Sequence, residues 1–145
     1  MKDDALNLLR EVVISVQSAS KTLNIYPQLR ITCASGAKFE AHASITDVQS
    51  KLEIFEIEIW SVAEFSELQQ WPGGPAVEWN EVEEISNVLR ASEIEAISAH
   101  YSDQGFLEGE PVPGMSELKF RLNSGESFVL SHLNRPGFIE TGFSR

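Results

Sequence analysis

Leu29-Arg-Ile-Thr-Cys-Ala34 runs into Ser35-Gly36 and then into Lys38-Phe-Glu-Ala-His-Ala43, and this stretch decides the fold that the sequence predicts. In both flanking runs apolar and polar residues alternate, which is typical of strands with one buried face. The glycine between the runs can adopt the positive φ angle that a tight turn requires. Residues 29–43 are therefore predicted to form a β-hairpin.

A similar pattern recurs near the C-terminus. Strands are predicted over Leu118–Asn123, Ser127–Leu133 and Phe138–Phe143, with turns at Ser124-Gly125 and Pro136-Gly137, which together make an antiparallel meander. The first hairpin of this meander matches the earlier hairpin at an offset of 89 residues. The likeness indicates either an internal duplication or the ordinary appearance of two hairpins with Ser-Gly turns. We favour the second interpretation, because the intervening segments do not repeat convincingly.

The central part of the chain contains two further strand candidates. Lys51–Trp60 alternates, but its apolar phase changes near Ile54, which predicts a β-bulge because one extra residue swaps the buried face. Residues 92–102 are compatible with a strand or a helix, and we favour a strand. The glycines and prolines in the segment 104–115 predict a long loop.

The N-terminal region predicts a helix over Asp3–Leu23, because apolar residues are spaced three and four apart and two acids stand where the helix dipole favours them. The β-branched run Val12–Val16 leaves a strand as the alternative.

Two capping boxes predict short central helices, since in each box two side chains satisfy otherwise free backbone N–H groups. Ser61 with Glu64 begins the first helix, which ends before the rigid turn Trp71–Pro75, and Asn80 with Glu83 begins the second. The inward face of the second helix is expected to consist of Val82, Ile85 and Leu89.

These elements together predict an α+β fold made mainly of antiparallel sheet, with an N-terminal helix, two Ser-Gly hairpins, a C-terminal meander and two short central helices. The chain has 145 residues, of which 42% are apolar, and this is enough to bury a core without disulfides. We therefore expect a single domain over residues 1–145.

The negative charge of the sequence is regional. The net charge is −11, yet the segment from Leu52 to Leu118 holds 15 acids and one base, Arg90, and so carries −14. We expect Arg90 to pair with a neighbouring glutamate. Such a segment repels phosphate backbones and anionic lipid heads, so neither a nucleic acid nor a membrane is an expected partner. The alternative is that the charge serves only to keep the protein soluble.

The location expected from the sequence is the cytoplasm. The apolar runs are only a few residues long, whereas a bilayer-spanning helix needs roughly 20. The N-terminus carries Asp3 and Asp4 where an export signal needs a basic flank. One cysteine, Cys33, cannot form an internal disulfide, which fits a reducing compartment.

No motif in the sequence predicts catalysis. Cys33 lies within an alternating strand, so we expect a packed thiol. His42, His100 and His132 are isolated and lack the spacing of a zinc site. Paired carboxylates arise by chance where acids are this dense. We therefore expect no catalytic residue, no metal and no cofactor.

Aromatic residues among carboxylates are the remaining pattern. Acids steer a Lys- and Arg-rich protein toward a surface, and aromatic rings anchor it by burial and cation–π contact. For each tryptophan taken alone, simple packing is the favoured alternative. The expected partner-binding residues are Glu56, Glu58, Trp60, Trp71, Glu78, Trp79, Glu81, Glu84, Glu108 and Glu110.

The function expected from this pattern is that of an acidic protein-binding module. Its most concrete form is an immunity protein that binds and neutralises a basic protein toxin such as a nuclease. The alternatives are a secretion chaperone for a protein cargo and a small enzyme with a carboxylate or metal site.

Overall fold

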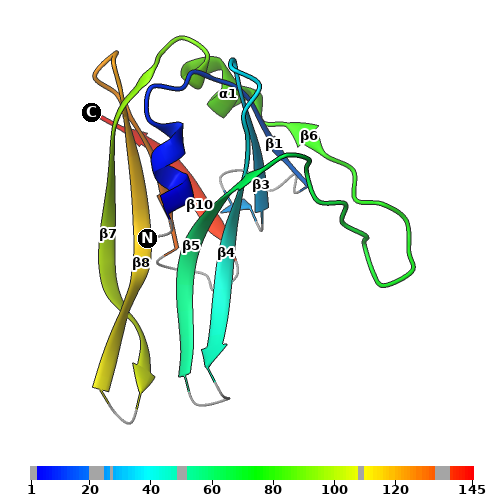
Figure 1. The fold of residues 1–145 in the computed structure, drawn as a ribbon, viewed down its shortest axis with the longest axis vertical. Helices are drawn as coiled ribbons and strands as arrows, with labels where there is room; N and C mark the ends of the chain where they lie inside the picture. Colours follow the sequence, from blue (N-terminus) through cyan, green and yellow to red (C-terminus); the bar gives the residue numbers. More distant parts are fainter. Residues whose placement is uncertain (1–2, 20–24, 27, 49–51, 108–109, 133–137) are drawn as a thin grey trace.

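The computed structural model describes residues 3–19, 25–26, 28–48, 52–107, 110–132 and 138–145. Two antiparallel sheets pack around one buried apolar cluster (Figure 1). Within the described residues the one α-helix is α1, Glu83–Leu89, and a short 3-10 helix, η1, spans Asp3–Leu8. The fold is therefore mostly antiparallel sheet with a single α-helix.

The first sheet has the strand order β5-β4-β3-β1-β6 and the second has the order β2-β10-β9-β8-β7. The strands of the first sheet are β1 Val13–Ser18, β3 Gln28–Cys33, β4 Lys38–Val48, β5 Leu52–Val62 and β6 Asn80–Glu81. The strands of the second sheet are β2 Ile25–Tyr26, β7 Ile94–Leu107, β8 Glu110–Leu122, β9 Ser127–Ser131 and β10 Ile139–Ser144. Both predicted Ser-Gly hairpins, the strand predicted over 92–102 and the three strands of the C-terminal meander are confirmed. Its predicted turn at Pro136-Gly137 lies outside the described residues.

The two sheets repeat one plan, in which η1 precedes β1, β3, β4 and β5, and α1 precedes β7, β8, β9 and β10. Their tight turns match in detail. Gly36 has a φ of 93° and Gly125 a φ of 94°. The N–H of Gly36 donates to the carbonyl of Cys33 at 2.9 Å, as the N–H of Gly125 donates to Leu122 at 3.0 Å. This shared order of elements favours internal duplication. From the sequence alone, duplication was the less favoured of the two interpretations.

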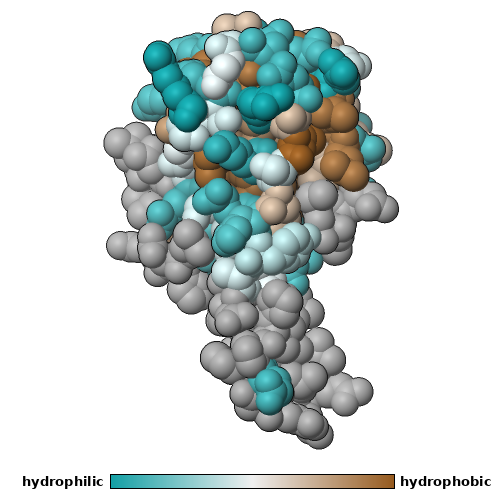
Figure 2. Space-filling view, turned by 90° about the vertical axis from the view of Figure 1, so that its left-hand side faces the viewer, coloured by the Kyte–Doolittle hydropathy of each residue, from teal (hydrophilic) through white to brown (hydrophobic). Residues whose placement is uncertain are grey.

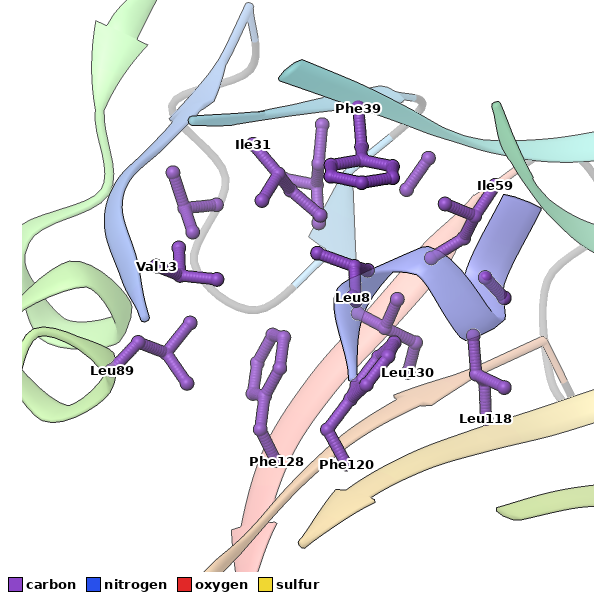
Figure 3. Close-up of a cluster of buried hydrophobic side chains, with 14 of the residues drawn as sticks. Leu8, Val13, Ile31, Phe39, Ile59, Leu89, Leu118, Phe120, Phe128 and Leu130 are labelled. Atoms are coloured by element: carbon purple, nitrogen blue, oxygen red, sulfur yellow. The ribbon is translucent and has the colours of Figure 1, made fainter. Parts of the chain in front are cut away.

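The apolar core lies between the two sheets (Figure 3). Phe39 and Ile59 from the first sheet and Leu118 and Phe120 from the second each expose 2% or less of their surface. Leu8 of η1 is also in this cluster and exposes 1%. Burying one such side chain stabilises a fold by roughly 1.5–3 kcal/mol. Both halves of the chain therefore contribute to one apolar cluster.

The helix predicted over Asp3–Leu23 is wrong beyond its first turns. The chain leaves the helical region at Arg10, whose φ is 72°, and Val13–Ser18 pairs with β3 as a strand. The β-branched residues of this run favour an extended backbone, and the neighbouring strand supplies hydrogen-bond partners for it.

The helix predicted from Ser61 and Glu64 is also wrong. The backbone N–H of Ser61 donates to Oδ2 of Asp4 at 2.9 Å, and β5 continues through Val62. Glu64 lies 3.6 Å from Nζ of Lys38 instead of capping a helix. Partners distant in the sequence thus replace the local capping box.

Two further corrections concern β5 and the segment 104–115. The β-bulge expected near Ile54 is absent, because β4 and β5 pair residue by residue from Lys38↔Val62 to Val48↔Leu52. The loop expected over 104–115 is instead the end of the β7–β8 hairpin, which pairs through Leu107↔Glu110. Among the described residues β9 pairs with β8 only from Glu117 onward, so one side of β8 tolerates the prolines before it.

The helix α1 confirms one prediction and corrects another. Ile85 and Leu89 are buried and Val82 exposes 8%, as the predicted inward face requires. However, Asn80 belongs to β6 and pairs with Ser18, while the N-cap position is Val82 without a side-chain cap. No helix in the described residues has the length and apolar character that crossing a membrane needs.

The surface of the described residues is largely hydrophilic in the view of Figure 2, with apolar residues gathered at one side. The larger exposed apolar side chains include Leu6 of η1, Leu9 just after it, Tyr101 of β7 and Trp71, of which Trp71 exposes the most, 58%. Trp71 is therefore the most exposed large apolar group among the described residues.

Candidate protein-binding surface

Residues 63–79, which we call the Trp71 hairpin, connect β5 to β6 and project from the body of the molecule (Figure 1). Two backbone hydrogen bonds join the limbs of this hairpin: Val77 N–H donates to Leu68 O at 2.7 Å, and Gln70 N–H donates to Pro75 O at 2.9 Å. An isolated bridge pairs Gln69 with Ala76 between them. The Trp71 hairpin is thus a small antiparallel ribbon and not an irregular loop, and we also call it the ribbon.

The tip of the ribbon is the predicted turn, and the structure confirms it. The N–H of Gly74 donates to the carbonyl of Trp71 at 2.8 Å, and Gly73 adopts a φ of 76°. The N–H of Gly73 also donates to Oε1 of Gln69 at 3.1 Å. A Cβ atom added at Gly74 would lie 2.5 Å from the indole of Trp71, so the ring rests against this glycine. The turn therefore fixes the position of an exposed tryptophan.

The root of the ribbon is the part that packs on β3 and β4. It is held by Glu40, whose side chain is completely buried. Oε2 of Glu40 accepts hydrogen bonds from the backbone N–H of Ser66 at 3.3 Å and from its hydroxyl at 3.0 Å. Oε1 of Glu40 accepts from the amide of Gln28 at 3.1 Å. A buried carboxylate is tolerated when hydrogen bonds satisfy it, and Arg30, its register partner across the β3–β4 hairpin, adds a positive charge nearby.

Arg30 ties both limbs of the ribbon to the sheet. Its guanidinium donates to the carbonyl of Ser66 at 2.6 Å. The same group lies 3.9 Å from the ring centroid of Trp79 and 5.0 Å from that of Phe65. Burial lowers the pKa of Arg30, and the charge of Glu40 opposes this effect. Hydrogen bonding and cation–π attraction together anchor Phe65, Ser66 and Trp79 on the outer face of β3 and β4.

His42 completes the group of side chains at the root of the ribbon. We call this group, which consists of Gln28, Arg30, Glu40, His42 and Ser66, the root cluster. Its ring packs against Trp60 with centroids 4.4 Å apart, and its Nε2 lies 3.6 Å from Oε1 of Glu40. Burial lowers the pKa of His42, while Glu40 and Glu58 act in the opposite direction with smaller effect. The imidazole is therefore a packing group that is neutral near neutral pH.

The expected partner-binding residues do not form one surface. Trp71 and Glu78 lie on the ribbon, whereas Trp60 and Trp79 pack into its root. Alternation of buried and half-buried positions places Glu56, Glu58 and Trp60 on one face of β5, as the sequence predicts.

The remaining members of the expected set lie elsewhere. Glu81 is bound to Arg90 at 2.9 Å and to the hydroxyl of Ser15 at 2.7 Å. Glu84 is exposed on α1, and Glu110 is exposed at the start of β8. Glu108 lies outside the described residues. The structure thus brings six of the ten residues to the ribbon and the face of β5 beside its root.

Sequence reasoning missed the residues that hold the ribbon. Four of them alternate with core positions in β3 and β4, where outward polar residues are usually solvated, and the other two lie in the ribbon itself. A signal was present nonetheless, because the Ser-Gly turn fixes the hairpin register and so places Arg30 directly opposite Glu40. The missed residues are Gln28, Arg30, Glu40, His42, Phe65 and Ser66.

Metal and thiol chemistry depend on how the His, Cys, Asp and Glu side chains are placed. In the part of the chain that the structure describes, no three His, Cys, Asp or Glu side chains come together as a metal site would require. Cys33 is buried, and burial is the main cause that raises its pKa to about 12, so it is a protonated core thiol.

No family model, curated protein or solved structure matches this chain. The class of the protein is therefore inferred from its geometry and charge: an antiparallel two-sheet protein that presents an exposed tryptophan on an acidic ribbon.

Proposed function

We propose that this protein is a binding module for a basic protein, and most concretely an immunity protein that neutralises a cationic toxin such as a nuclease. The observation that carries the proposal is the internal use of Arg90, the one base between Leu52 and Leu118. Its guanidinium donates to Glu81 at 2.9 Å, to the carbonyl of Ile14 at 2.6 Å and to Asn87 at 3.0 Å. This cation therefore serves the junction of α1 and β1, and it also lies 3.7 Å from the exposed carboxylate of Glu83.

Bases from outside this segment neutralise only some of its acids. Arg10 lies 3.6 Å from Glu93, and Arg121 lies 2.9 Å from Glu95. Within the described residues no ion pair involves the exposed carboxylates of Glu67, Glu78 and Glu84. An uncompensated acidic surface accelerates the encounter with a cationic protein and disfavours anionic partners.

The experiment is a binding measurement against basic proteins encoded beside this chain in its source genome. We expect one of them to form a complex whose association rate falls steeply with added salt, because screening weakens steering. We also expect co-expression of this chain to relieve the toxicity of that protein in a bacterial host. The proposal fails if no neighbouring basic protein binds even at low salt.

A further inference from the structure

We propose that the Trp71 hairpin is the contact element for the partner, and that it receives a Lys- or Arg-bearing segment of a protein between the Trp71 ring and the carboxylates of Glu67 and Glu78. This inference rests on the proposed function and specifies where the partner binds. It is carried by three features of the ribbon: exposure of the ring, pre-organisation of its position, and an unneutralised carboxylate pair.

Exposure is the first of these features, because Trp71 is the most exposed large apolar residue among those that the structure describes. Trp71 exposes 58% of its surface, and the core cluster of buried residues contains no member of the range 67–78. Tryptophan is enriched among the few residues that dominate binding energy at protein interfaces. The Trp71 ring is therefore suited to anchor a partner by being buried in the interface.

Pre-organisation reduces the entropy lost when such an anchor binds. The indole rests against Gly74, and the turn is closed by the hydrogen bond between Gly74 and Trp71. The root is fixed by the buried Glu40 and by Arg30. Both ends of the ribbon are thus set by contacts that do not depend on a partner.

Charge identifies the occupant as basic. Glu67 precedes Gln69 by two positions and Glu78 follows Ala76 by two, so the Gln69↔Ala76 bridge places both glutamates on one face. Burial supports this alternation, since Glu67, Gln69, Ala76 and Glu78 are exposed and the residues between them in each limb are half-buried. Like charges across a ribbon are destabilising, and a cation between them removes that repulsion.

Trp71 follows Glu67 by four positions on the same limb of the ribbon, so a basic segment of several residues can reach both the carboxylates and the ring. An ammonium or guanidinium group over an indole face gains roughly 0.5–2 kcal/mol, more when water is excluded. The ribbon thus offers acids for attraction and a ring for anchorage within residues 67–78.

The test uses the intact protein and a 20-residue poly-L-lysine as the basic probe, with affinity measured by titration calorimetry. We expect Trp71→Ala to weaken binding by about tenfold, Trp71→Phe to retain most of it, and Trp71→Leu to retain less than Trp71→Phe because it lacks a π face. Unchanged thermal unfolding of each variant shows that the fold is intact.

A matched pair of double variants separates the ribbon from overall charge. Glu67→Gln with Glu78→Gln removes two charges from the ribbon, and Glu117→Gln with Glu126→Gln removes one charge from β8 and one from the β8–β9 turn, where neither residue has an ion pair among those described. We expect the first pair to weaken binding by about tenfold and the second by less than about twofold.

Two outcomes overturn different statements. If the wild type binds poly-L-lysine in a salt-dependent manner but the ribbon variants bind as well as it does, or the second pair loses as much as the first, the ribbon is not the contact element. If the wild type shows no salt-dependent binding to poly-L-lysine, the proposed function itself fails.

Discussion

Gly74 shows how one residue can determine the position of another. A methyl group there would lie 2.5 Å from the Trp71 indole, a separation that real Cβ atoms do not tolerate. Trp71 and Glu78 were among the residues that the sequence analysis selected, because aromatic residues that stand among acids can be recognised in the sequence. The reason why Trp71 is ordered was not visible, since it depends on a contact formed only when the turn closes.

Gly74→Ala should displace the indole and weaken poly-L-lysine binding by several-fold, with a change in unfolding free energy below about 1 kcal/mol because the site lies on the surface. Iodide quenching of tryptophan fluorescence reports the displacement, and calorimetry reports the binding. Gly142→Ala is the control, since a Cβ atom there meets nothing within 4 Å. Equal binding by both variants would contradict the role assigned to Gly74.

Glu40→Ala should lower the unfolding free energy by about 3 kcal/mol, because it leaves the Gln28 amide and the N–H of Ser66 without their shared acceptor and removes the negative charge near Arg30. Urea denaturation measures the loss, and Glu40→Gln should lose less since its amide oxygen can still accept a hydrogen bond. A loss below about 1 kcal/mol for Glu40→Ala would mean that the root cluster is not a stabilising anchor.

His42 should make stability depend on pH. Burial lowers its pKa below the ordinary 6.5, so the folded state favours the neutral ring more than the unfolded state does. This contribution is fully present above pH 6.5 and is lost as pH falls through the folded pKa. Urea denaturation at pH 7 and pH 5.5 should show a smaller loss for His42→Gln than for the wild type, and an equal loss would contradict this.

At the scale of elements, local signals predicted structure wherever local groups satisfy the backbone. The two Ser-Gly turns and the inward face of α1 are of this kind, since each depends on residues adjacent in sequence. The helix expected from Ser61 fails because Asp4 accepts the N–H that a capping box would use. The root cluster was missed for the same reason, because Glu40 meets Ser66 across 26 positions of chain.

The ribbon should be separable from the fold. Residues 67–78 contribute nothing to the buried core cluster, and Ser66 and Trp79 already contact the root. Replacing 67–78 by a short Gly-Asn-Gly turn should preserve the circular dichroism spectrum and a cooperative melt while abolishing tight poly-L-lysine binding. A deletion variant that fails to fold would show that the ribbon stabilises the sheet.

At the scale of the whole molecule, the two repeats, η1 to β5 and α1 to β10, contact each other through elements of both. α1, which opens the second repeat, packs on β1 of the first, and η1 of the first repeat contacts β7 of the second. The backbone N–H of Arg10 donates to Ile94 O at 2.8 Å, and that of Ile94 donates to Glu11 O at 2.9 Å. Each sheet therefore relies on the other to cover its apolar face.

Neither half should fold alone. A fragment of residues 1–80 would expose the inner faces of β3 and β4, including Ile31 and Phe39, which expose 3% and 1% in the intact chain. We expect its proton NMR spectrum to lack the dispersion of a folded protein, whereas the intact chain shows it. A well-dispersed spectrum for the fragment would mean that the repeats are independent folding units.

The separation of the ribbon from the core bears on how the specificity of such a protein can evolve. Most substitutions destabilise, and chains tolerate them only while stability stays above a threshold. Since the tip is attached at one polar root and shares no buried core side chain with the sheets, substitutions at Trp71 or Glu78 leave that stability reserve nearly untouched. Under the proposed function, a lineage could thus exchange one target for another by substitutions within residues 67–78, with the scaffold beneath them unchanged.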